Sequence, residues 1–142
     1  VPYKGTTPAV TALISGEVQL AIQDAGVIAP HAKLGKLRSI AVTSAQPSAL
    51  APGLPAVAAS GLPGYEWVGM TGMWVPAKTA AAIIERLNQE VVRLLNGAEV
   101  KQRFFSAGAE VVASSSEQFL AIIKSDTVRM GKVIKEAGIK AD

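Results

Sequence analysis

The stretch GTTPAVTALISGEVQLAIQD (residues 5–24) passes from a turn through a short helix into an apolar segment that ends in a polar turn. Thr7 is suited to accept a backbone N–H as an N-cap, and Pro8 then takes the first helical position, where a missing N–H costs nothing. Gly16 is predicted to end this helix, and Val18–Ile22 is predicted to be a short strand. The stretch predicts a helix-to-strand unit, the building block of an α/β fold.

The rest of the chain repeats this alternation. Apolar side chains recur at helical spacing in the C-terminal half, and Ser114 with Glu117 forms the S-x-x-E pattern that is typical of a capping box. Alternating helices and strands of this kind favour a sheet covered by helices. The predicted helices cover residues 26–34, 79–96, 98–107 and about 115–137, with a helical turn at 56–60, and the further predicted strands cover 37–43, 65–75 and 109–113.

Composition excludes several classes of protein. The 142 residues are 49% hydrophobic and 18% charged, with a net charge of +3 and no cysteine, so that disulfides and Cys-based zinc sites are absent. Basic residues are scattered and aromatic residues are only 5%, which argues against a nucleic-acid groove. No apolar run approaches the roughly 18 residues needed to span a bilayer.

Residues that could carry catalysis are few. His31 is the only histidine, and it has no partner in sequence for a catalytic triad or a metal cluster. Ser114, Ser115 and Ser116 fit a helix cap better than a nucleophile, and no phosphate-binding or nucleophile-elbow motif is present. We therefore predict no enzyme activity, no metal and no cofactor.

Two turns are candidates for ligand contact. The Gly5-Thr6-Thr7 turn directs free N–H groups and the positive end of a helix dipole at one point, which favours an anion, although a capped helix start can also bind only water. Asp24 follows a predicted strand at its carboxyl end, where ligands sit in open α/β sheets. An alternative role for Asp24 is the N-cap of the helix at 26–34.

Several stretches resemble the Bug-type periplasmic solute-binding receptors of tripartite tricarboxylate transporters. VPYKGTTPAVTALISGEVQLAI (1–22) is similar to the family's "VPYKG-small-small-PA…LLGGQVDL" stretch. PHAKLGKLRSIAVTS (30–44) is similar to "PHIKAGKLRALAVTS", and LPAVAASGLPGYEW (54–67) to "VPTVAEAGLPGYE". WVPAKTAAAIIERLNQEVVRLL, VKQRFFSAGAEVV, SSSEQFLAIIKSD and VIKEAGIK then follow the family order. The resemblance covers nearly the whole chain.

The resemblance implies a type II periplasmic-binding-protein fold, in which two α/β lobes enclose a ligand. The family's mature chain is roughly twice as long, so we interpret this sequence, which has no initiator methionine or signal-peptide pattern, as a mature or truncated C-terminal half. By analogy, residues 1–68 belong to the second lobe, 69–76 form the hinge or crossing strand, and 77–142 return toward the first lobe. With the N-terminal lobe missing, we expect an uncovered apolar surface and a homodimer or domain swap.

The resemblance also implies the site. Family ligands are often small carboxylates held by backbone amides and water, which carries ligand contact to Gly5, Thr6, Thr7 and Ala9, with Tyr3 shaping the pocket. The second expected contact is the turn at residues 23–25, namely Gln23, Asp24 and Ala25. The family usually has aspartate where this chain has Gln23 and Gln19, and it commonly has Arg, Thr and Glu around Pro47, Ala56 and Ala59.

The expected function is that of an extracytoplasmic, periplasmic receptor that captures a small carboxylate for a transporter and docks to its membrane permease subunits. An alternative with the same architecture is the ligand-sensing effector domain of an intracellular regulator, because fold alone does not separate the two. An enzyme is disfavoured because the sequence has no acid–base pair or nucleophile constellation.

Overall fold

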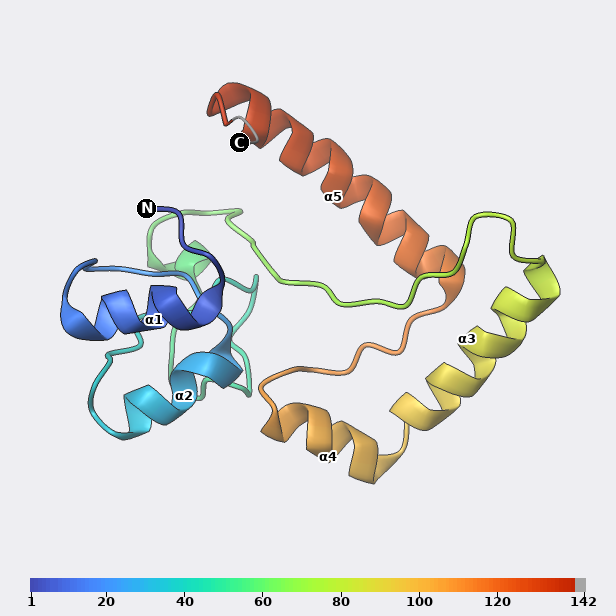
Figure 1. The fold of residues 1–142 in the computed structure, drawn as a ribbon, viewed down its shortest axis with the longest axis horizontal. Coiled ribbons are helices and arrows are strands. Elements are labelled where there is room, and N and C mark those ends of the chain that lie inside the picture. Colours follow the sequence, from blue (N-terminus) through green and yellow to red (C-terminus); the bar gives the residue numbers. More distant parts are fainter. Residues whose placement is uncertain (140–142) are drawn as a thin grey trace. The chain divides into compact units, whose positions relative to one another are not determined.

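The computed structural model describes residues 1–139, and within them it contains helices joined by long extended segments (Figure 1). Each helix matches a segment with helical spacing of apolar residues or with a capping signal in the sequence. In chain order the elements are α1 (Thr6–Ser15), α2 (Ala25–Lys33), the 3-10 helix η1 (Val57–Ser60), α3 (Ala81–Leu95), α4 (Ala98–Ser106) and α5 (Ser116–Glu136).

The chain divides into two compact units. The first unit comprises Val1–Met73 and Lys101–Glu110, and the second comprises Trp74–Val100 and Val111–Asp142. The chain therefore changes unit three times, and one of these changes falls inside α4, between Val100 and Lys101. Each unit is described separately below.

The core of the first unit is small. Among the described residues, the apolar side chains that are buried are Val10 and Ala12 of α1 and Ala56 before η1, which are 4%, 3% and 2% exposed. A parallel bridge joins Val42 to Ala56, and the Val42 amide donates to the Pro55 carbonyl at 2.9 Å. The buried side chains are small or medium in size, so this core holds little apolar volume.

A contact between two backbones joins α2 to the end of α4 within the first unit. A Cβ added to Gly26 would clash with the carbonyl oxygen of Ala107, and a Cβ added to Gly108 would clash with the Cα and N of Gly26. Gly108 also has a φ of 83°, a left-handed conformation that ends α4 and favours glycine. Glycine at both positions is what permits this approach.

The second unit contains α3 and α5, which contact each other. The Asn88 side chain donates to the Ser114 carbonyl at 3.1 Å, and the rings of Trp74 and Phe119 lie 5.4 Å apart at a tilt of 54°. These contacts hold the start of α5 near the middle of α3. No helix within residues 1–139 is long and apolar enough to cross a membrane.

The predicted strands do not form within residues 1–139. Residues 18–22, 65–75 and 109–113 have no ladder, and residues 37–43 contribute only the isolated bridge at Val42. A strand needs a neighbour that supplies a row of backbone hydrogen bonds, and the described chain offers these segments no such neighbour. The apolar pattern was read correctly as extended backbone at Val42, but pairing cannot be read from a local pattern.

Two predicted helix caps are shifted. Helix α1 begins at Thr6 with Gly5 as its N-cap, instead of beginning at Pro8 with Thr7 as the cap, because Gly5 adopts φ 107° and ψ 177°, which allows an earlier start. Helix α5 is capped by Ser115 with Gln118, one residue later than the predicted pair of Ser114 and Glu117. The Ser115 hydroxyl accepts the Gln118 amide at 3.2 Å, and the Gln118 side chain accepts the Ser115 amide at 2.9 Å.

Candidate functional site

The first turn of α1 carries backbone amides that no intrahelical bond uses. The first four N–H groups of any helix lack an intrahelical acceptor. Here the Gly5 amide donates to the Tyr3 carbonyl at 2.9 Å, and Pro8, in the third helical position, has no N–H at all. The amides of Thr6 and Thr7 remain, on exposed residues, with no side-chain cap and no acidic residue in the first turn.

This arrangement favours a negative charge near Thr6 and Thr7. The positive end of the helix dipole adds to the two amides, and no carboxylate in the first turn compensates it. The Thr7 carbonyl accepts the Thr11 hydroxyl at 3.1 Å, a contact that leaves its amide unaffected. The start of α1 is therefore able to accept an anion. The side chain of Thr7, which was the predicted N-cap, accepts none of its amides.

Tyr3 lies beside this turn and is half-buried. Its hydroxyl donates to Oε1 of Glu17 at 3.0 Å. Partial burial raises the pKa of the Tyr3 phenol, and the hydrogen bond to the Glu17 carboxylate and the nearby negative charge raise this pKa further. Tyr3 is therefore a neutral hydrogen-bond donor at neutral pH. Its bond to Glu17 joins the segment before α1 to the segment after it.

A small pocket of about 230 Å³ brings three of the expected site residues together. These are Tyr3, Ala9 and Gln23; Gly5, Thr6, Thr7, Asp24 and Ala25 do not line it. The remaining lining residues are Val1, Val18, Leu20, Ala21 and Ile22. The sequence did not indicate these five, because residues 18–22 were predicted only as a short strand and Val1 carries no motif; the apolar character of 18–22 is the signal that could have identified four of them.

The turn at residues 23–25 leads directly into α2. Asp24 occupies the N-cap position of α2, and its carbonyl accepts the amides of Val27 and Ile28 at 3.1 and 3.2 Å. Its side chain makes no capping hydrogen bond, although the N-cap role was one of the two alternatives for Asp24. The carboxylate faces Gly69 instead, since a Cβ at Gly69 would lie 3.8 Å from Oδ1.

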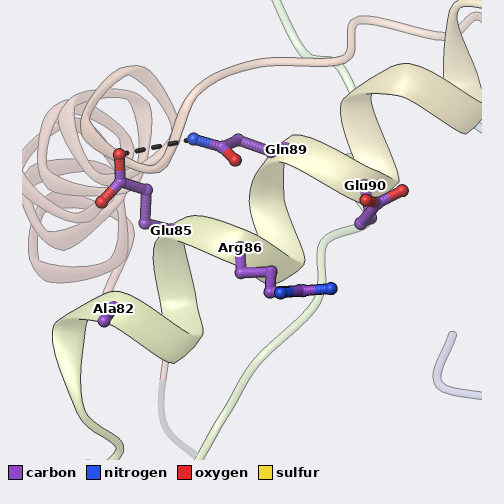
Figure 2. A pocket seen from close by; sticks show the side chains of 5 residues that line it. All are labelled: Ala82, Glu85, Arg86, Gln89 and Glu90. Carbon is purple, nitrogen blue, oxygen red and sulfur yellow. Dashed lines mark hydrogen bonds between the residues drawn. The ribbon is translucent and has the colours of Figure 1, made fainter.

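A larger hollow of about 470 Å³ lies on α3 in the second unit, and Figure 2 shows its lining. All of its residues come from α3, namely Ala82, Glu85, Arg86, Gln89 and Glu90. Gln89 donates to Glu85 at 3.4 Å, and Glu90 accepts Arg93 at 2.7 Å, so these groups pair along the helix. One helix supplies one wall only, and we therefore prefer the smaller pocket beside α1 as the candidate site.

Metal-ligating groups do not gather in the described part of the chain. No group of three or more His, Cys, Asp or Glu residues within it could hold a metal ion. Nδ1 of His31 on α2 is buried without a hydrogen-bond partner there, but His31 lies outside the pocket beside α1.

Comparison with known proteins places the chain in a family. Residues 1–139 match the family described as Tripartite tricarboxylate transporter family receptor. The chain belongs to this family. A UPF0065 protein of Bordetella bronchiseptica is 31% identical to this receptor-family chain over 140 residues, which are 99% of the chain and 42% of that protein.

Two solved structures share the fold of this receptor-family chain. The structure of R. palustris Rpa4515 with adipate has a TM-score of 0.81 and 32% identity, and it covers 97% of this chain and 46% of that one. The periplasmic binding protein BugD has a TM-score of 0.82 and 30% identity, covering 100% of this chain and 48% of BugD. The fold is that of part of a periplasmic binding protein, in the α/β type II class expected from the sequence. The chain spans about half the length of these structures.

Proposed function

We propose that this chain is the part of an extracytoplasmic solute-binding receptor that holds a small carboxylate, with the first turn of α1 and the turn at residues 23–25 as its contacts. The observation that carries the proposal is the pair of unused amides at Thr6 and Thr7, at a helix start without a side-chain cap or an acidic residue in its first turn. Membership in the receptor family supports a binding role over catalysis.

The pocket beside α1 has no charged side chain among its lining residues. Six of its eight lining residues are aliphatic, and the polar side chains are those of Tyr3 and Gln23, neither of which carries a charge at neutral pH. In this proposal an anion at the pocket is held by these two neutral side chains, by water and by the amides of Thr6 and Thr7, which lie outside the pocket lining. The relative solved with adipate is consistent with a carboxylate ligand.

The proposal extends to the protein's setting. In it, residues 1–68 form second-lobe material, 69–76 the hinge or crossing strand, and 77–142 the segment that returns toward an N-terminal lobe. The receptor works in the periplasm and delivers its carboxylate to membrane permease subunits. Support for this setting comes from the family match and from the description of BugD as a periplasmic binding protein.

Replacing Thr6 by proline tests the role of the amides. Thr6 is the first helical position of α1, where proline removes the N–H and fits the helix without distortion. Loss of one charge-assisted hydrogen bond of about 1.5–3 kcal/mol should weaken adipate binding by at least tenfold. Thr6→Ala is the matched control, because it removes the side chain and keeps the amide, and its affinity should equal that of the unmodified chain.

Calorimetric titration with adipate, succinate and citrate measures these affinities. The proposal is supported when a carboxylate binds the unmodified chain and Thr6→Ala equally and binds Thr6→Pro more weakly. Equal binding to all three proteins would show that the amide makes no contact with the anion. Failure of all three carboxylates to bind the unmodified chain would contradict binding by this chain on its own.

A further inference from the structure

Two backbone segments approach the turn at residues 23–25 or the residue that follows it. On one side, Gly26 lies against Ala107 and Gly108, so closely that a side chain on either glycine would clash. On the other side, the Asp24 carboxylate faces Gly69. All of these residues belong to the first unit. The turn at residues 23–25, whose last residue is the first of α2, therefore lies near two segments that are distant in sequence.

Gly26 and Gly131 differ in what surrounds them. Both are helical glycines without a positive φ, so neither is required by its backbone angles. A Cβ at Gly131 would meet nothing within 4 Å, whereas a Cβ at Gly26 would meet the Ala107 carbonyl and the Gly108 backbone. Glycine inside a helix is normally a cost. At Gly26 the missing side chain allows the end of α4 to approach the start of α2 closely.

We propose that Gly26 and Gly108 are positioning residues, whose backbone contact holds the turn of Gln23, Asp24 and Ala25 in the orientation in which it meets a bound carboxylate. This inference rests on the proposed function. The contact acts one residue from the turn, because Gly26 follows Ala25 directly. A displacement at Gly26 turns the first residues of α2 and moves Gln23, which lines the pocket, along with them.

Amide hydrogen exchange on Gly26→Ala tests the positioning role, with Gly131→Ala as the matched control. The amides of Val27 and Ile28 both donate to the Asp24 carbonyl and report the geometry of the turn. In Gly26→Ala they should exchange about tenfold faster, together with the amides of Gly108 and Ala109, while the amides of α5 keep their rates. In Gly131→Ala the amides of residues 27 and 28 should exchange as in the unmodified chain.

Two results would overturn the inference. One is unchanged exchange at Val27 and Ile28 in Gly26→Ala, and the other is a uniform acceleration that includes α5, which would mean that the glycine serves only global stability. A second pair covers the case in which Gly26→Ala does not fold. Gly108→Ala and Gly16→Ala share a positive φ, of 83° and 80°, but only Gly108 has a neighbour that a Cβ would strike. Local acceleration at Val27 and Ile28 should therefore appear in Gly108→Ala only, and equal effects of the two would refute the contact.

Adipate titration separates this inference from the proposed function. With binding to the unmodified chain established, Gly26→Ala should weaken it by about tenfold and Gly131→Ala should leave it unchanged. Unchanged affinity in Gly26→Ala would overturn the positioning role and leave the receptor function standing. Absence of binding to the unmodified chain would count against the proposed function, while the exchange rates would still decide whether the glycine contact fixes the turn.

Discussion

Gln23 is the residue at which a single side chain tests the charge that the pocket accepts. It is half-buried and lines the pocket, and its amide can donate to a carboxylate. In Gln23→Asp the new carboxylate should repel an anionic ligand, so we expect adipate affinity to fall on the order of tenfold or more. Gln19→Asp is the matched control, because Gln19 is exposed and outside the pocket. Equal affinities of the two variants in calorimetry would contradict a role for Gln23.

Tyr3 makes stability depend on pH at the alkaline end. Burial and the Glu17 carboxylate raise the pKa of Tyr3 in the folded chain above its ordinary value near 10. Above that ordinary value the unfolded chain loses the phenol proton while the folded chain keeps it, so the free energy of unfolding should fall as pH rises from about 10 through the folded pKa. Below pH 10 the contribution of Tyr3 should be fully present.

Tyr3→Phe should remove this alkaline loss. Urea unfolding at a series of pH values from 8 upward measures the free energy of unfolding of both proteins. Ultraviolet absorbance follows the ionisation of tyrosine with pH, and the difference between the two proteins gives the ionisation of Tyr3 apart from that of Tyr65. The same dependence of unfolding on pH in Tyr3→Phe and in the unmodified chain would show that the hydrogen bond to Glu17 does not persist in solution.

At the scale of elements, the capping box of α5 distinguishes two neighbouring serines. The Ser115 hydroxyl accepts the Gln118 amide, whereas Ser114 contributes its carbonyl to Asn88. Ser115→Ala should lower the free energy of unfolding by about 1 kcal/mol, the usual cost of losing an N-cap side chain. Ser114→Ala keeps the carbonyl and should lie within about 0.5 kcal/mol of the unmodified chain. Urea unfolding compares the two, and a larger loss in Ser114→Ala would place the cap where the S-x-x-E pattern put it.

Helices were predictable from sequence because their bonds are local. The predicted helices at 79–96, 98–107 and about 115–137 agree with α3, α4 and α5 to within two residues, and η1 was expected at 56–60. Periodic apolar residues and glycine stops suffice for this. Helix starts were less certain: at α1 the unusual angles of Gly5 displaced the cap by two residues, and a pattern search does not anticipate such angles.

Strands and the site were only partly predictable because both depend on distant partners. Val18–Ile22 is apolar enough for a strand, yet in the described chain it forms no strand and four of its five residues line a pocket. The amide-rich turn at Gly5–Thr7 was found from sequence, as was the glycine stop at Gly108. The contact between Gly26 and Gly108 was not predicted, because the two glycines are separated by 81 residues and neither has a local pattern that indicates it. Whether the expected residues contact a ligand stays a prediction.

At the scale of the whole molecule, exposed apolar side chains predict self-association. On α3, Ile83, Leu87 and Leu94 are 56%, 41% and 56% exposed, and their spacing places them along one side of the helix. Apolar surface gathered in this way marks an interaction face. We expect sedimentation equilibrium to show a mass above 14.7 kDa that increases with protein concentration.

Leu87→Lys should weaken this association by about tenfold, because a buried leucine contributes about 1.5–3 kcal/mol. Gln89→Lys is the control, because this substitution adds the same charge at another position of α3. Gln89 lines the polar hollow on that helix (Figure 2). A constant monomer mass at all concentrations, or an equal effect of both variants, would show that this side of α3 is not the face through which copies associate.

The most direct test of the receptor function is a titration of the isotopically labelled chain with adipate, followed by the nuclear magnetic resonance signals of its backbone amides. The account predicts saturable shifts of the Thr6 and Thr7 amides, accompanied by those of Gln23 to Ala25, while the amides of residues 82–90 on α3 stay in place. Saturable shifts confined to α3, or signals of Thr6 and Thr7 that do not move while adipate binds elsewhere, would contradict it.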